Sequence, residues 1–134
     1  MRIDETNEIL SLMKRWDVGN IEVGMISFVG SPVPLERGTQ VGFVEADPLI
    51  VLNNKEEMLV EETGMNGHIL WYVAKNPSSF LNALVVAARF LSERTIGLVD
   101  LYDIPAAKSI ARDCTRRAGG DRYSAFYSML LGVE

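Results

Sequence analysis

Six carboxylates between residues 45 and 62 come nearest, by type and spacing, to a chemical site in this chain. Two carboxylates held together can divide the roles of general acid and general base. The adjacent pairs at 56–57 and 61–62 argue against that chemistry, because neighbouring residues of a strand point to opposite faces. Two interpretations remain: a solvated sheet surface, or a binding face that imitates a phosphate backbone and attracts a basic protein. The six residues are Glu45, Asp47, Glu56, Glu57, Glu61 and Glu62.

The single histidine, His68, is a weak candidate for a metal ligand. It follows Gly67 at the start of a predicted strand, with no cysteine or suitably spaced carboxylate beside it. A zinc site needs three or four such ligands. We therefore interpret His68 as a strand-end residue and predict no metal ion.

The single cysteine, Cys114, is surrounded in sequence by three arginines that can lower the pKa of a thiol. It also lies three and four residues from Ala111 and Ile110, on the apolar side of a predicted helix. A buried, unreactive thiol is the better interpretation, and a Cys114–His68 pair lacks a third group to orient it. The arginines are Arg112, Arg116 and Arg117.

The glycines form no phosphate-binding loop and no nucleophile elbow, so the sequence predicts no cofactor and no catalytic residue. Trp71 and Tyr72 are adjacent in a predicted strand and must face opposite sides. One of them is expected to pack under a helix. Tyr72 joins the six carboxylates as a predicted partner-binding residue, since exposed aromatic side chains are favoured at interfaces.

The elements that position these residues are read from hydrophobic periodicity and from turn residues. Four strands at hairpin spacing are predicted over 40–45, 49–52, 57–62 and 68–74, with turns at Asp47-Pro48, Asn53-Asn54 and Gly64–Gly67. An earlier strand is predicted over 21–29, followed by a loop from Gly30 to Gly38.

Helices are predicted on both sides of this meander. Asp4 begins the first, over about 4–16, and Asn76-Pro77 begins the second, whose expected apolar face includes Phe80, Leu84 and Val85. A third helix is predicted over 105–118 and ends at Gly119-Gly120. A fourth over 122–131 is capped by Asp121, while 95–102 fits either a strand or a helix.

The expected fold is therefore α+β: one domain over 1–134, with a mainly antiparallel sheet of about four to six strands flanked by an N-terminal helix and two or three C-terminal helices. The chain has 134 residues and a net charge of −5. Residues 1–74 hold 12 acids and 5 bases, which argues against nucleic-acid binding. One cysteine, no signal peptide and no membrane span predict a cytoplasmic protein.

Parts of the sequence resemble the SUKH superfamily, which includes a fungal regulator of cell-wall glucan synthesis and many bacterial immunity proteins. The resemblance covers roughly residues 40–134. It is carried by Val41-Gly42-Phe43, by the run from Val73 to Leu81, and by the C-terminal stretch from Cys114 to Gly132. It implies an α+β fold with a central antiparallel sheet, no enzymatic activity, and neutralisation of a nuclease or deaminase toxin by direct binding.

Two other functions stay open at this point. A secretion chaperone for an effector is also small and acidic, and would be a stable homodimer, whereas an immunity protein can be a monomer. A small hydrolase that uses the carboxylates or His68 would need a bound metal or a deep pocket. The expected partner is a protein, most simply a basic toxin domain.

Overall fold

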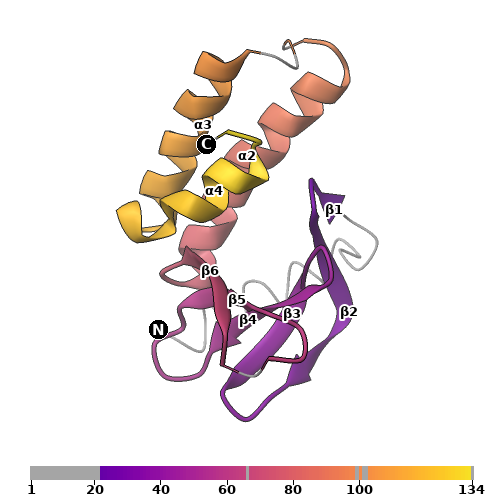
Figure 1. Cartoon of the computed structure of the whole chain (residues 1–134), viewed down its shortest axis with the longest axis vertical. Helices are drawn as coiled ribbons and strands as arrows, with labels where there is room; N and C mark the ends of the chain where they lie inside the picture. Colours follow the sequence, from indigo (N-terminus) through magenta and orange to yellow (C-terminus); the bar gives the residue numbers. More distant parts are fainter. Residues whose placement is uncertain (1–21, 66, 99, 101–102, 134) are drawn as a thin grey trace.

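The computed structural model describes residues 22–65, 67–98, 100 and 103–133. The helix expected over 4–16 and the start of the expected strand at Ile21 lie outside the described residues. Within them the expected α+β architecture with an antiparallel sheet is confirmed (Figure 1).

The sheet is a six-stranded antiparallel meander in which every strand pairs with its neighbour in the sequence. Hydrophobic and β-branched residues dominate most of the strands, as a sheet covered by helices requires. The strands are β1 (Glu22–Val23), β2 (Ile26–Pro34), β3 (Gly38–Val44), β4 (Asp47–Leu52), β5 (Met58–Glu61) and β6 (Ile69–Ala74).

The prediction of one strand over 21–29 followed by a loop was wrong. The chain reverses at Gly24, whose φ of 58° favours glycine, so that Val23 pairs with Ile26. β2 then continues through the prolines to Pro34. Because β1 has only two residues, most of β2 has no partner on that side among the described residues, and a proline is tolerated in such an edge position.

The turn expected at Asp47-Pro48 lies two residues earlier, at Glu45 and Ala46, and both expected turn residues begin β4. Glu45 has a φ of 55°, a left-handed conformation that closes the hairpin. The turn at Asn53-Asn54 is confirmed. Gly42 lies so close to β2 that a Cβ there would collide with the carbonyl oxygen of Ser27.

Three α-helices follow the sheet, and their predicted starts and stops are largely confirmed. The Asn76 side chain accepts a hydrogen bond from the Ser79 N–H at 2.8 Å, and Asp103 caps the next helix at 3.0 Å. Asp121 is not a side-chain cap but begins a short 3₁₀ turn. The elements are α2 (Pro77–Thr95), α3 (Ile104–Ala118), η2 (Asp121–Tyr123) and α4 (Ser124–Leu130).

Between α2 and α3, the described residues 96–98 and 100 form neither a helix nor a strand. Among the described helices, none is both long enough and apolar enough to cross a membrane.

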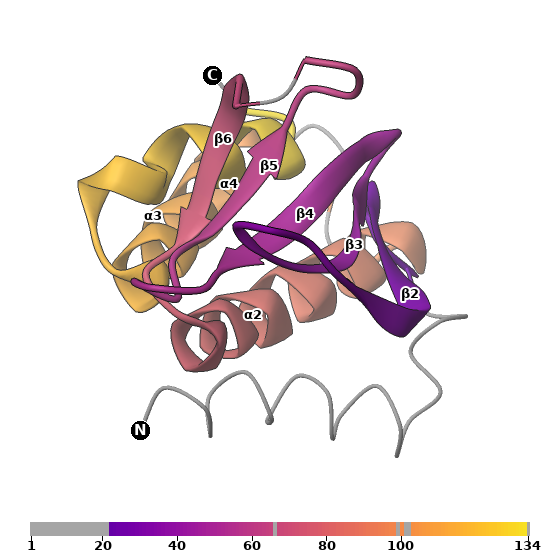
Figure 2. The same ribbon diagram turned by 90° about the horizontal axis from the view of Figure 1, so that it is seen from below.

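One hydrophobic core joins the helices to the sheet. Figure 2 shows α2 running along the strands, with α4 packed against β6 and α3 packed against α2. Phe80 is fully buried, and its ring centroid lies 6.4 Å from that of Phe28 in β2. The expected face of α2 was wrong at one position: Val85 is 68% exposed, and the buried stripe passes through Ala83 and Ala87 instead.

The C-terminal helices are tied to β6 by hydrogen bonds as well as by packing. The buried Tyr127 hydroxyl donates to the Val73 carbonyl oxygen at 2.8 Å, and the Lys75 N–H donates to the Ala118 carbonyl oxygen at 2.9 Å. The Trp71 and Phe126 rings meet edge to face at 6.5 Å, so Trp71 is the aromatic that packs under a helix.

Candidate functional site

The six predicted carboxylates fall into two groups with different surroundings. Glu56 and Glu61 are each only 4% exposed, and the Glu57 side chain is 12% exposed. Glu45, Asp47 and Glu62 stay accessible to solvent. The expectation of one solvated acidic sheet surface was therefore wrong, because half of its members are covered.

Glu61 is the last residue of β5, and its buried side chain contacts an arginine that comes from the opposite end of the strands. Arg37, in the β2–β3 turn, donates from Nε to Glu61 Oε2 at 2.7 Å and from Nη2 to Oε1. The hydrogen bond from this guanidinium to Glu61 outweighs desolvation and raises the pKa of Arg37. Both carboxylate oxygens are occupied, so Glu61 is a structural residue.

Glu57, itself largely covered, is the centre of a second network, which reaches the C-terminal helices at the surface. Its carboxylate accepts from Arg122 Nε and Nη2 at 2.6 and 3.2 Å, and from the Tyr123 hydroxyl at 2.8 Å. Burial alone would raise the pKa of Glu57, but these hydrogen bonds outweigh it and lower the pKa. Burial, and then the same hydrogen bond, raises the pKa of Tyr123 to about 12.

Tyr72 is covered by the same arginine. The guanidinium carbon of Arg122 lies 3.8 Å from the centroid of the Tyr72 ring, which is a cation–π contact. Tyr72 is thus half-buried, and the group exposed beside it is the Arg122 guanidinium. A pocket of about 520 Å³ opens here and is lined by Tyr72, Arg122, Arg37 and Lys55 among others. Glu36 and Glu57 also line this pocket, and Arg37 and Arg122 are paired with Glu61 and Glu57, so this end of the sheet carries both charges and is not the acidic face that the sequence predicted.

The accessible carboxylates gather at the other end of the strands, where the β3–β4 and β5–β6 turns meet. Thr63 fastens the two turns: its N–H and hydroxyl each lie 3.0 Å from Asp47 Oδ1, and its hydroxyl donates to the Ala46 carbonyl oxygen at 2.7 Å. Glu45 lies in one turn and Glu62 begins the other.

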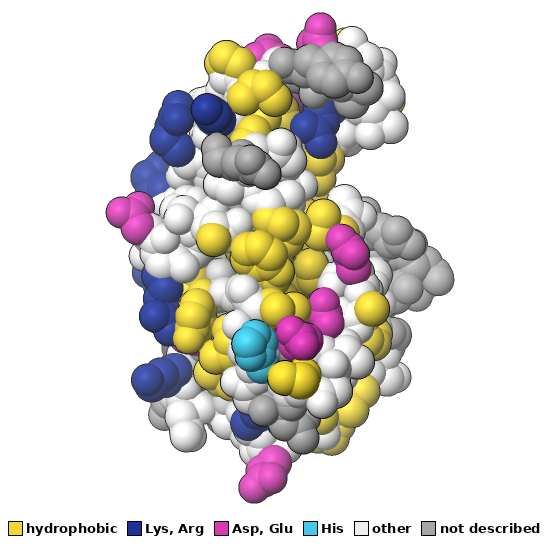
Figure 3. All heavy atoms as spheres, viewed as in Figure 1, with side chains coloured by type: hydrophobic (Ala, Val, Ile, Leu, Met, Phe, Trp, Pro, Cys, Tyr) yellow, Lys and Arg dark blue, Asp and Glu magenta, His cyan; other side chains and the backbone are white. Residues whose placement is uncertain are grey.

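Apolar side chains accompany these acids. Phe43 is 36% exposed and Met65 is 51% exposed. His68 Nε2 lies 3.9 Å from Glu62 Oε1, and Figure 3 shows the histidine beside acidic and hydrophobic side chains on one open face. We name this surface the acidic hairpin end, and it consists of Glu45, Asp47, Glu62, Phe43, Met65 and His68.

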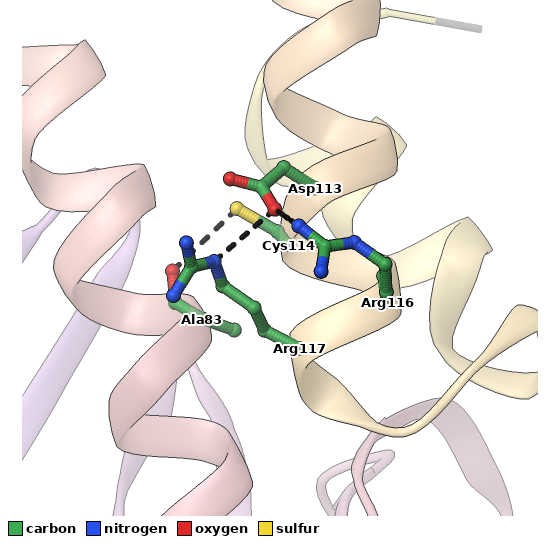
Figure 4. Close-up of polar contacts among 5 residues, drawn as sticks. All are labelled: Ala83, Asp113, Cys114, Arg116 and Arg117. Atoms are coloured by element: carbon green, nitrogen blue, oxygen red, sulfur yellow. Dashed lines mark hydrogen bonds and ion pairs between the residues drawn. The ribbon is translucent and has the colours of Figure 1, made fainter.

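Cys114 is buried, as predicted. Its thiol lies 3.5 Å from the Ala83 carbonyl oxygen of α2 (Figure 4). Burial, reinforced by Asp113, raises the pKa of the thiol to about 12 in spite of Arg117. Arg116 and Arg117 both turn to the Asp113 carboxylate, so they do not activate the thiol. A protonated, buried thiol is a poor nucleophile.

Sequence reasoning missed three residues. Arg37 and Arg122 are the basic partners of the buried acids, and Thr63 joins the two turns by hydrogen bonds. No local pattern links Glu57 to Arg122, which is 65 residues away. The available signal was the excess of bases over acids in residues 75–134, which can neutralise acids of the first half. In the described ranges, no group of three His, Cys, Asp or Glu side chains is arranged to hold a metal ion.

Comparisons of this chain with protein-family models, with curated proteins and with solved structures found no match.

Proposed function

We propose that this chain is a non-enzymatic protein-binding domain that holds a basic partner protein against the acidic hairpin end. The observation that carries the proposal is the gathering of Glu45, Asp47 and Glu62 where Thr63 fastens two turns, with exposed Phe43 and Met65 beside them. An apolar centre with charged residues around it is the composition of a protein interface. Turns held by hydrogen bonds lose little conformational freedom when a partner binds.

The partner we propose is a toxin domain of the nuclease or deaminase type, which the chain neutralises by covering it. Such domains bind nucleic acid, so their working surfaces are basic. Three accessible carboxylates would speed the approach of that surface and orient it. This part of the proposal rests on the resemblance of residues 40–134 to the SUKH superfamily.

Acid–base catalysis is less well supported by the surroundings of the carboxylates. The carboxylates of Glu57 and Glu61 already accept hydrogen bonds from arginines, and Glu56 is buried. A general base needs a lone pair within reach of a substrate proton. Of the six predicted carboxylates, only Glu45, Asp47 and Glu62 are accessible enough to meet that condition.

The test compares two double variants of equal charge in affinity capture from the native lysate. Glu45→Gln with Glu62→Gln removes two charges from the acidic hairpin end. Glu36→Gln with Glu93→Gln removes two exposed or half-exposed charges from the β2–β3 turn and from α2. We expect a basic partner to be recovered by the wild-type chain and by the control, and to be lost by the first variant, more so in high salt.

A partner recovered equally by all three chains would place the interface elsewhere and overturn the assignment of the site. Neutralisation is tested by expressing the recovered partner alone and together with the chain. Growth arrest by the partner that the wild-type chain relieves, and that the first variant does not, supports the toxin assignment. A partner that is harmless alone overturns it.

A further inference from the structure

A second surface, on α3 and the turn that follows it, carries the opposite charge. A pocket of about 760 Å³ lies between α3, the end of β6 and the segment from Gly119 to Val133. This volume lies within the range of small-molecule sites, about 300–1,000 Å³. The pocket shares no residue with the acidic hairpin end, so an inference about it is independent of the function proposed above.

Four cations line the pocket. Lys108, Arg112 and Arg116 recur every four residues along α3, and therefore share one face of that helix. Three side chains at this spacing cover about 12 Å of helix. Lys75 joins them from the residue after β6 and lies against Gly119, whose φ of 134° and close contact with the Lys75 side chain disfavour a larger residue.

These cations are poorly neutralised within the described part of the chain. Arg116 pairs with Asp113 (Figure 4), but no described carboxylate forms an ion pair with Lys75, Lys108 or Arg112. Asp121 is the only acid among the described lining residues. In Figure 3 one group of dark blue side chains lies at the upper left, over α3, and a second group lies lower on the left, beside the sheet.

Solubility does not account for this cluster. The chain has a net charge of −5, so a basic face lowers the net charge that keeps it soluble. Like charges four residues apart on one helix also repel each other and destabilise it. An anion bound between them would remove that repulsion.

Neutral donors complete the pocket. Ser124 and Ser128, four residues apart on α4, place two hydroxyl groups in the lining, and the buried Thr115 adds a third. The C-terminal end of α3 would ordinarily repel an anion. Here the N–H groups of Gly119 and Gly120 occupy the carbonyl oxygens of Thr115 and Arg116, which weakens that repulsion.

We propose that this pocket on α3 binds a small soluble molecule carrying two or more phosphate groups. Guanidinium groups match phosphate oxygens in paired hydrogen bonds, lysines add point charges, and hydroxyl groups donate to the remaining oxygens. The elongated row of cations fits several phosphates in series better than a single one. The described lining contains no aromatic side chain on which a nucleobase could stack, so the phosphates carry the recognition.

Isothermal titration calorimetry with sodium tripolyphosphate tests the proposal on the whole chain. We expect saturable binding of one tripolyphosphate, with weaker binding of inorganic phosphate and a Kd that rises with salt. Lys108→Gln with Arg112→Gln should raise the Kd about tenfold or more, since two charged hydrogen-bonding groups are lost. Both side chains are exposed, so the variant should keep the wild-type melting temperature.

The matched control is Lys55→Gln with Arg89→Gln, which removes the same charge from an exposed turn and from α2. Its Kd should stay within about twofold of wild type, because exposed charges outside the pocket contribute little. Equal weakening in both variants would mean that only net charge matters and would overturn the proposal. So would the absence of binding heat, or tighter binding of a glutamate-rich peptide than of tripolyphosphate, which would assign the pocket to an acidic protein segment.

Discussion

Glu57 and Arg122 are 65 residues apart in the sequence, and the guanidinium of Arg122 donates two hydrogen bonds, of 2.6 and 3.2 Å, to the Glu57 carboxylate. Glu57 precedes β5, and Arg122 lies in η2 between α3 and α4. The pair therefore fastens the C-terminal helices to the sheet at a point where Tyr72 and Tyr123 also meet it.

Replacing Glu57 by glutamine should destabilise the fold by about 1–3 kcal/mol, since the largely covered Glu57 side chain loses the negative charge that accepts hydrogen bonds from Arg122 and Tyr123. The free energy of unfolding in urea measures this loss. Glu36→Gln is the control, because Glu36 is exposed, and it should change stability by less than about 0.5 kcal/mol. Equal stability of the two variants would mean that the pair does not fasten the helices.

The same carboxylate should make stability depend on acid pH. The folded state lowers the pKa of Glu57 below its ordinary value of 4.5. Its contribution is therefore fully present above about pH 4.5 and is lost as the pH falls through the lower, folded-state pKa. The difference in unfolding free energy between wild type and Glu57→Gln, measured from pH 6 to pH 3, should shrink on acidification. A difference that is constant over this range would contradict the assignment.

Cys114 should resist thiol reagents in the native protein. A pKa of about 12 leaves almost no thiolate at pH 8, and the side chain is fully buried. Reaction with 5,5′-dithiobis(2-nitrobenzoic acid) should be slow in buffer and complete in guanidinium chloride, where the same thiol is exposed. Rapid reaction under native conditions would show that α2 and α3 separate easily.

Gly42→Ala should destabilise the sheet by about 1–3 kcal/mol, as overpacking does in a filled interior. The added Cβ would meet the backbone carbonyl oxygen of Ser27, which cannot move without disturbing the pairing of β2 with β3. Thermal unfolding measures the effect. Thr39→Ala on the same strand is the control, and it should be the milder change because Thr39 is only half-buried.

Local signals predicted most of the architecture. Asn76 and Pro77 predicted the start of α2, Gly119 predicted the end of α3, and Asn53-Asn54 predicted a turn between two strands. These signals work because each acts on the backbone within a few residues. The signals failed where tertiary context decides. Pro32 lies inside β2 and Pro34 ends it, and both are tolerated because the described residues leave most of one side of that strand unpaired. Asp47-Pro48 begins β4 because Glu45 adopts the turn conformation.

The predicted partner-binding residues show the same limit. Glu57 and Glu61 read as exposed acids because their partners, Arg122 and Arg37, come from distant turns and leave no mark on the neighbouring sequence. The pocket cations on α3 were equally hard to find: their four-residue spacing is visible, but the facing hydroxyl groups of α4 appear only in the folded chain.

β6 is an edge strand of the described sheet, and the unpaired N–H and C=O groups of an edge strand can pair with another chain. Here the C-terminal helices bond to part of that backbone. The Tyr127 hydroxyl donates to the Val73 carbonyl oxygen, and the Lys75 N–H, just after β6, donates to the Ala118 carbonyl oxygen. A chain from which the helices had been cleaved or frayed would present an apolar, hydrogen-bonding rim. The C-terminal helices therefore protect β6 from pairing with other chains, and their removal should lead to fibrous aggregation.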